Sequence, residues 1–167
     1  VHNAMFAVAV AHGLGASFAH IGDGLMGLTG SHTDTPGRLD FFTGFSFQVI
    51  LDYAHNAQEF HALSAVIRQL ECPGRRIIAF TSPGNRTDPH IDNLAAIAAE
   101  YSYDHYICYR RDDLRGRGPS EVPERLRDGL LAAGIAAQNI SVVPAEKDTN
   151  NAALGMAEAG DLVALLY

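Results

Sequence analysis

Phe47-Gln48-Val49-Ile50-Leu51-Asp52-Tyr53-Ala54-His55-Asn56 is the stretch of sequence that decides the fold. An apolar run that includes two β-branched residues stops at Asp52, and a tyrosine, an alanine, a histidine and an asparagine follow before a helical pattern begins. This order is typical of a buried strand that delivers polar groups at its carboxyl end, with a helix leaving directly afterwards. In open α/β sheets, ligands bind at that edge. The stretch therefore predicts an α/β sheet with a ligand site near Asp52 and His55.

Beyond this stretch, strand and helix patterns alternate along the chain. The predicted strands and helices, in chain order, are strand 45–52, helix 57–70, strand 76–81, helix 90–101, strand 104–109, helix 120–133, strand 140–143, helix 148–159 and strand 161–166. Asp148 is a candidate N-cap, Pro123 falls in a first turn where its missing N–H is harmless, and Gly134 suits a C-cap. Repeated strand–helix units predict a three-layer, Rossmann-like α/β domain with a mostly parallel sheet of about five or six strands.

Composition limits the class of protein. The 167 residues are enough for one domain with a sizeable core, and the formal net charge is -7. This charge argues against a nucleic-acid-binding face, and no apolar run approaches the roughly 18 residues of a membrane span. The two cysteines, Cys72 at a helix end and Cys108 inside a strand pattern, indicate reduced thiols rather than a disulfide framework. We therefore expect a cytoplasmic protein that binds neither nucleic acid nor membrane.

The start of the chain differs from the rest. Helical patterns at 3–14 and 21–28 precede a loop of Ser, Thr, Asp and His at about 30–36. The first residue is Val1, in what reads as the middle of a helix, so we expect the sequence to be a piece of a longer chain. The expected domain organisation is an N-terminal piece at 1–30, a linker at 31–36 and the α/β domain at 37–167.

Several motifs resemble those of a known family. Asp52-Tyr53-Ala54-His55-Asn56 resembles the Asp-Tyr-Ala-His-x-Pro motif that opens the C-terminal domain of Mur ligases, and the related motif of folylpolyglutamate synthases. Pro36-Gly37-Arg38-Leu39-Asp40 resembles the Pro-Gly-Arg-x-Glu/Asp motif that precedes it, and Ala57 replaces a proline that only shapes the helix start. Arg111–Arg117 and Ala79–Asp88 are similar to segments of cyanophycin synthetases, whose C-terminal half is Mur-like. The resemblance covers nearly the whole chain and is greatest to that branch.

The resemblance implies an ATP-dependent amide ligase that works through an acyl phosphate, with ATP and Mg held mostly by a central domain outside this sequence. Residues 1–30 resemble the end of that domain, where Asn3 matches the second asparagine of an Asn-x-x-Asn-Ala pattern and is therefore expected to be a cofactor-binding residue. Asp52 is then expected to contact the ribose or a phosphate-bound magnesium, His55 a phosphate, and Arg38 the phosphate oxygens that suit its planar fork. Taken alone, Asp52 reads as a helix N-cap, His55 as a helix-start histidine and Arg38 as a solvated side chain.

A second group of polar residues follows the other predicted strands. It comprises Asn85, Arg86 and Asp88, the charged segment 110–118, and Glu146 with Lys147. In Mur ligases the loop that corresponds to 110–118 contacts the incoming amino acid, so the resemblance implies a substrate site. The expected substrate-binding residues are Asn85, Arg86, Asp112, Asp113, Arg115 and Arg117.

Asp112 and Asp113 suit a guanidinium, because paired carboxylate oxygens accept it bidentately. Arginine is therefore the expected amino acid, with a peptide or polymer as the acceptor. A solvated loop with internal ion pairs is the alternative account of the 110–118 segment.

Two other functions stay open. One is another branch of the family, a muramyl peptide ligase or a folylpolyglutamate synthase, although the 110–118 segment lacks the Asp-Asn-Pro-Arg of several muramyl ligases. The other is a non-catalytic Rossmann-like module that binds a nucleotide or an amino acid. The sequence has no Gly-x-x-x-x-Gly-Lys-Ser/Thr loop, no Gly-x-Ser-x-Gly elbow and no Cys/His cluster. We expect no metal site in this sequence and no activity from it alone, and homo-oligomerisation stays open.

Overall fold

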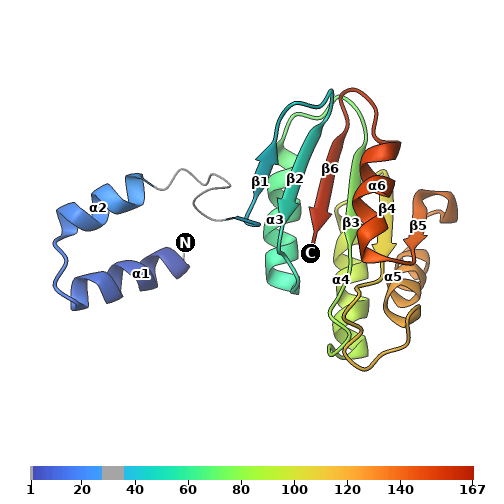
Figure 1. Ribbon diagram of the computed structural model, residues 1–167, viewed down its shortest axis with the longest axis horizontal. Coiled ribbons are helices and arrows are strands. Elements are labelled where there is room, and N and C mark those ends of the chain that lie inside the picture. Colours follow the sequence, from blue (N-terminus) through green and yellow to red (C-terminus); the bar gives the residue numbers. More distant parts are fainter. Residues whose placement is uncertain (1, 28–35) are drawn as a thin grey trace. The chain divides into compact units, whose positions relative to one another are not determined.

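The computed structural model describes residues 2–27 and 36–167, and the chain divides into two compact units, Val1–Pro36 and Gly37–Tyr167 (Figure 1). The first unit contains α1 (His2–Gly13) and α2 (Phe18–Met26). Ser17 caps α2, because its side chain accepts a hydrogen bond from the backbone N–H of His20. Apart from Pro36, the predicted loop at 30–36 and linker at 31–36 lie outside the described residues.

The second unit is built on a six-stranded sheet with the order β1-β2-β6-β3-β4-β5. The strands are β1 (Asp40–Phe42), β2 (Gln48–Asp52), β3 (Arg76–Phe80), β4 (His105–Tyr109), β5 (Ile140–Val143) and β6 (Leu162–Leu166). β1 runs antiparallel to β2, and the other neighbouring strands pair in parallel. The predicted mostly parallel sheet is therefore confirmed, and β6 lies inside it between β2 and β3.

Helices cover both faces of this sheet. They are α3 (Ala57–Gln69), α4 (Asp88–Glu100), α5 (Glu121–Ala132) and α6 (Glu146–Met156), with a short 3-10 turn at Ala137–Asn139. Residues of α3, α4 and α5 pack into one core cluster, whereas α6 packs into the other. Figure 1 shows α6 on the opposite side of the sheet from α3 and α4. The unit is thus the predicted three-layer α/β arrangement.

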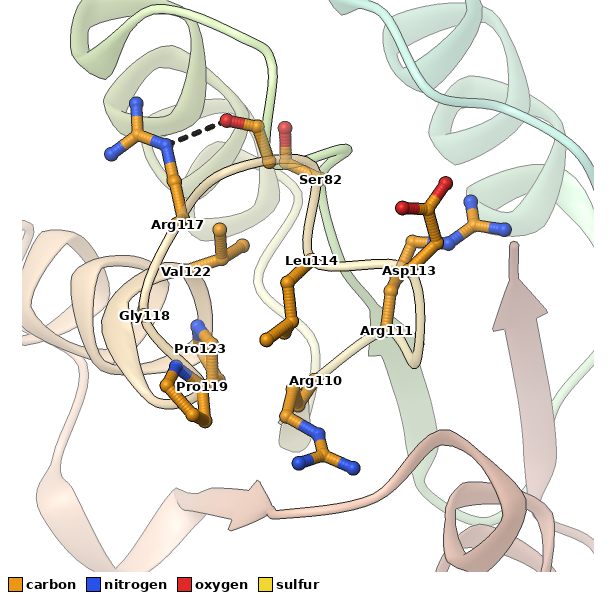
Figure 2. A pocket seen from close by; sticks show the side chains of 11 residues that line it. Ser82, Arg110, Arg111, Asp113, Leu114, Arg117, Gly118, Pro119, Val122 and Pro123 are labelled. Atoms are coloured by element: carbon orange, nitrogen blue, oxygen red, sulfur yellow. Dashed lines mark hydrogen bonds between the residues drawn. The ribbon is translucent and has the colours of Figure 1, made fainter.

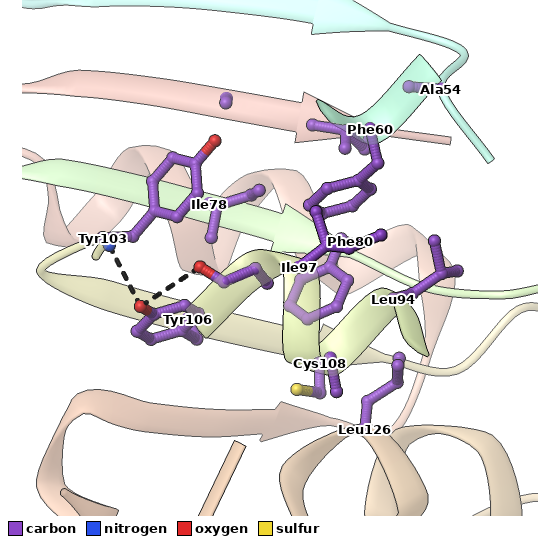
Figure 3. Packing of buried hydrophobic residues seen from close by; sticks show 14 of the residues in the cluster. Ala54, Phe60, Ile78, Phe80, Leu94, Ile97, Tyr103, Tyr106, Cys108 and Leu126 are labelled. Atoms are coloured by element: carbon purple, nitrogen blue, oxygen red, sulfur yellow. Dashed lines mark hydrogen bonds between the residues drawn. The ribbon is translucent and has the colours of Figure 1, made fainter. Parts of the chain in front are cut away.

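Successive side chains of each strand point to opposite faces of the sheet, so the hydrophobic core consists of two clusters, one on each face. In β4, Tyr106 and Cys108 face the layer of α3, α4 and α5, whereas Ile107 faces α6. Figure 3 shows the larger cluster, in which Phe60 of α3 meets Phe80 of β3 edge to face, with ring centroids 5.5 Å apart. Because the central strands are buried on both sides, their sequences read as continuous apolar runs. Cys72 and Cys108 are free thiols, as predicted, and burial raises the pKa of Cys108.

Several details differ from the sequence prediction, among them the bounds of α2, α4 and α6. The predicted strand 45–52 is shorter, because residues 43–47 form the turn of a hairpin whose other arm is β1, a strand that the sequence did not reveal. Gly44 sits in this turn at φ +110, a conformation that favours glycine. Asp52 is not the N-cap of α3, since four residues separate the strand from the helix and Asn56 caps it by accepting from Glu59 N at 3.0 Å. Asp148 is not an N-cap either, because α6 begins two residues earlier, at Glu146.

Candidate functional site

The carboxyl ends of the parallel strands lie at one edge of the sheet, and the predicted site residues of the second unit form two groups there. We call the first the Asp52 cluster; it consists of the predicted residues Arg38, Asp52 and His55, together with Tyr53 and Glu59, which contact them. The second is the 110–118 loop that follows β4, together with Asn85 and Arg86 after β3. Asn3 lies in α1, within the other unit.

Asp52 is half-buried at the end of β2. Its Oδ2 accepts a hydrogen bond from the backbone N–H of Leu39 at 2.7 Å, which ties the Pro-Gly-Arg turn to the strand. Burial raises the pKa of Asp52, and hydrogen bonds from the N–H groups of Leu39 and Ala54 and the charge of Arg38 offset only part of that rise. Its ionised form is therefore under-stabilised, and a cation or hydroxyl donor brought to this carboxylate would be held favourably.

Glu59 joins the two basic residues of the Asp52 cluster. Its Oε2 lies 3.3 Å from His55 Nδ1 and accepts the His55 backbone N–H at 3.2 Å, and its Oε1 lies 3.8 Å from Arg38 Nη1. The Arg38 guanidinium also lies 5.8 Å from the centre of the Tyr53 ring. Arg38 is thus held only loosely, with its side chain 52% exposed, and can turn toward a ligand. The sequence analysis missed Glu59, although an Asn three residues before a Glu is the pattern of a reciprocal helix cap.

A cavity of roughly 380 Å³ connects the two groups. It is lined by Gly37, Leu51, Asp52, Tyr53, Arg111 and Tyr167. The lining residues include two tyrosines, Asp52 of the Asp52 cluster and Arg111 of the 110–118 loop, and the surface that they expose to the cavity is almost entirely apolar. A largely apolar hollow with a few polar residues at its rim is usual for a small-molecule site.

Arg117 anchors the far end of the 110–118 loop. Its Nε donates to Gly84 O at 2.8 Å and its Nη2 to Arg86 O at 2.7 Å, and it also pairs with Asp88 and Glu121. The side chain is 15% exposed, so these contacts occupy most of its donors. The structure gives Arg117 a structural role, and its predicted contact with substrate stays a prediction.

The carboxylates of the loop pair with arginines of the same loop. Asp112 Oδ1 lies 3.3 Å from Arg110 Nη2, and Asp113 Oδ2 lies 2.9 Å from Arg115 Nε. Both acidic side chains are about two thirds exposed, at 64% and 67%, so the pairs are open to exchange with another cation. Figure 2 shows Leu114 at the centre of the loop, with Arg110, Arg111 and Asp113 around it. Asn85 and Arg86 are exposed nearby, and whether any of these residues binds substrate stays a prediction.

Among residues 2–27 and 36–167, no group of three or more His, Cys, Asp and Glu side chains is arranged to hold a metal ion. In the same part of the chain, every helix is too short or too polar to cross a membrane.

Comparison with known proteins identifies the family. Residues 37–166 match the model of the Mur ligase, glutamate ligase domain. The chain belongs to the Mur ligase family. The resemblance predicted from the Asp52 and Arg38 motifs is therefore confirmed.

Relatives of this Mur ligase domain include cyanophycin synthetases. The protein of Nostoc sp. (strain PCC 7120) is 32% identical over 166 residues, which is 99% of this chain but 18% of the relative. A UDP-N-acetylmuramoyl-L-alanyl-D-glutamate--2,6-diaminopimelate ligase of Caldanaerobacter subterraneus is 25% identical over 99% of this chain and 32% of its own length. The Mur ligase domain thus spans about a fifth to a third of the relatives it matches.

Solved structures confirm the fold. E. coli FolC in complex with DHPP and ADP aligns with 98% of this chain and 35% of its own, with a TM-score of 0.72 and 23% identity. A murein peptide ligase from Psychrobacter arcticus aligns with 98% of this chain at a TM-score of 0.68 and 20% identity. At these identities the likeness shows the Rossmann-like fold of the Mur ligase domain.

Proposed function

We propose that this Mur ligase domain is the C-terminal domain of an ATP-dependent amide ligase that adds arginine to aspartate side chains of a polypeptide. The observation that supports the proposal is that Asp52 and Arg111 line one cavity, so the residues expected to contact the nucleotide and the loop expected to contact the amino acid lie at one edge of the sheet. The family supports ligase chemistry, and the identity to cyanophycin synthetases supports the choice of arginine. Other branches of the family, such as the diaminopimelate ligases, remain the second candidate.

The Asp52 cluster fits the ribose and phosphates of ATP. Arg38 and His55 supply donors that can turn from Glu59 to phosphate oxygens, and the under-stabilised carboxylate of Asp52 suits a ribose hydroxyl or a phosphate-bound magnesium. Related solved structures carry nucleotides, among them FolC with ADP and a Yersinia pestis folylpolyglutamate synthase with AMPPNP and Mn. The metal would draw charge from the transferring phosphate when bound.

In the ligation reaction an oxygen of the acceptor carboxylate attacks the γ-phosphorus of ATP, the bond to the β-phosphate breaks and ADP leaves, which gives an acyl phosphate. The amine of the amino acid then attacks the carbonyl carbon and loses a proton, and inorganic phosphate leaves as the amide forms. This domain would hold the amine in line through the 110–118 loop and exclude water from the acyl phosphate. Holding two reactants in a reactive geometry can supply a large part of a rate enhancement.

Residues 1–30 are proposed to be the end of a central ATPase domain that precedes this one, with a linker at 31–36. The support is the exposed apolar surface of α1, α2 and the turn between them, which includes Met5, Phe6, Leu14, Phe18 and Met26. The described residues of α2 include none that is buried, which is unusual for so apolar a helix. Packing against the rest of that central domain would cover this surface and bring Asn3 toward the nucleotide. A cytoplasmic location stays a prediction.

We expect Asp52→Asn in the full ligase to lower kcat/KM for ATP by tenfold or more, while the melting temperature stays within about 2 °C. Asparagine keeps an oxygen for the Leu39 N–H but removes the charge. Initial rates at varied ATP, beside a melting curve, measure both effects. The matched control is Asp104→Asn, since Asp104 accepts the Arg76 N–H at 2.7 Å at the other edge of the sheet. Unchanged ATP kinetics in the Asp52 variant would show that Asp52 has only a structural role, which is to hold the Pro-Gly-Arg turn to β2.

If arginine is the amino-acid substrate, changing Asp112 or Asp113 should affect the use of arginine and not the use of ATP. Asp112→Asn or Asp113→Asn should raise the arginine KM about tenfold and leave the ATP KM alone, because a guanidinium would replace Arg110 or Arg115 as their partner. Initial rates against arginine at saturating ATP and acceptor peptide provide the measurement. Asp128→Asn is the control, since Asp128 pairs with Arg127 outside the loop and is 62% exposed. If both loop variants keep the parental arginine KM, the loop is an internal ion-pair cluster.

A further inference from the structure

Glu146 begins α6 at the carboxyl end of β5 and reaches across to the 110–118 loop. Its Oε2 accepts the backbone N–H of Asp112 at 2.9 Å, and its Oε1 lies 3.8 Å from Arg111 Nη2. The α6 N-terminus has no side-chain cap, so the hydrogen bond described for this carboxylate goes to the loop rather than to its own helix. The hydrogen bond links residues that are 34 positions apart.

Among the described residues, the other hydrogen bonds and ion pairs from the loop to neighbouring segments lie at its two ends, and between them the Leu114 backbone packs against Gly84. At the start, Arg110 N extends the β4–β5 ladder by donating to Val143 O at 3.1 Å. At the end, Arg117 holds the loop to residues after β3 and to α5. Between them, the hydrogen bonds described for Asp113–Gly116 stay within the loop. Glu146 is therefore the contact that fixes the loop backbone where its two carboxylates begin.

Glu146 also contacts a residue that lines the cavity. Arg111 lines the cavity together with Asp52 and Tyr53, and its side chain is 20% exposed. Pairing with Glu146 favours one placement of the Arg111 guanidinium, and a carboxylate that accepts a backbone N–H makes a charge-assisted hydrogen bond. One side chain thus contacts both a residue that lines the cavity and the backbone at the start of the loop.

We propose that Glu146 is a positioning residue for ligation: it holds the Asp112 backbone and the Arg111 guanidinium so that the 110–118 loop presents its charged side chains to the incoming amino acid. This inference rests on the proposed function. Glu146 itself contacts no substrate, so its loss should weaken use of the amino acid and spare ATP.

The test compares Glu146→Ala and Glu146→Gln in the full ligase, with Lys147→Ala as the control on the adjacent exposed residue. The alanine variant should raise the KM for the amino acid about tenfold, with the ATP KM and the melting temperature close to the parent's. Glutamine keeps an acceptor for the Asp112 N–H and should recover most of the loss. Hydrogen exchange of peptides that cover 110–118 should quicken in the alanine variant and much less in the glutamine variant.

A purely structural role would lower the melting temperature and the kcat without separating the two KM values. That result overturns the proposal, as does an alanine variant with the parental KM for the amino acid and unchanged exchange. A parent protein that forms no amide from any amino acid overturns the proposed function instead, and that outcome is visible before any variant is made.

Discussion

Gly84→Ala is expected to lower kcat/KM for ligation about a hundredfold, the scale at which a displacement of about 1 Å disturbs a reactive geometry. A Cβ on Gly84 would lie 2.1 Å from the carbonyl oxygen of Leu114, whereas real Cβ contacts essentially never fall below 3.0 Å. The obstacle is backbone rather than a flexible side chain, so the segment after β3 and the 110–118 loop must move apart. Arg117, which bonds the Gly84 carbonyl oxygen, would lose its fit as well.

Gly155→Ala is the matched control for this substitution. A Cβ on Gly155, in α6, would meet no atom of another element within 4 Å, so alanine should leave ligation intact and raise stability by about 0.5–1 kcal/mol. The measurement is the initial rate of amide formation with both variants, beside their melting curves. Parental kinetics in the Gly84 variant would show that the loop tolerates displacement and does not set the reaction geometry.

Phe60→Ala is expected to lower the free energy of unfolding by about 3–5 kcal/mol, the usual cost of removing a buried aromatic side chain. Phe60 is 1% exposed and meets the ring of Phe80, so alanine would leave a cavity between α3 and the sheet. Urea denaturation measures the loss, with Val66→Ala as the control because Val66 lies in the same helix and is 37% exposed. A loss below about 1 kcal/mol would mean that the helix repacks over the cavity.

This helix also carries part of the site. Asn56 caps α3 and Glu59 lies in its first turn, so a shift of α3 moves the partner shared by Arg38 and His55. The Phe60 variant should therefore use ATP less well even at temperatures where it stays folded. If the proposed function holds, stability and nucleotide use are therefore expected to change together, because α3 contributes to both the core and the Asp52 cluster.

The parallel strands were predictable because their sequences are apolar on both faces. The predicted strands 76–81, 104–109, 140–143 and 161–166 agree with β3 to β6 within one residue at each end. β1 was not predictable in the same way, since it has three residues, of which Phe41 and Phe42 are exposed, and it depends on pairing with β2. An edge strand of this kind carries little local signal.

The residues of the candidate site that lie in short sequence motifs could be predicted from the sequence. Arg38, Asp52 and His55 were named from their motifs, and the structure brings them together around Glu59. Glu146 was noticed only as a residue after a strand, because the loop it bonds lies 34 positions away and no spacing rule connects them. The prediction that Asp148 caps α6 was wrong, because Glu146 and Lys147 already belong to the first turn of this helix.

The position of β6 has a consequence for synthesis of the protein on the ribosome. The last strand of the sheet to be translated is the one that fills the gap between β2 and β3. At about 5–20 residues per second, roughly 4–17 s separate the emergence of β3 from that of β6. During this interval the facing edges of β2 and β3 have no partner, and such edges bind other strands readily. The central pairing of the sheet can therefore form only after Leu166 has left the exit tunnel, so the parallel sheet is completed last by its central strand.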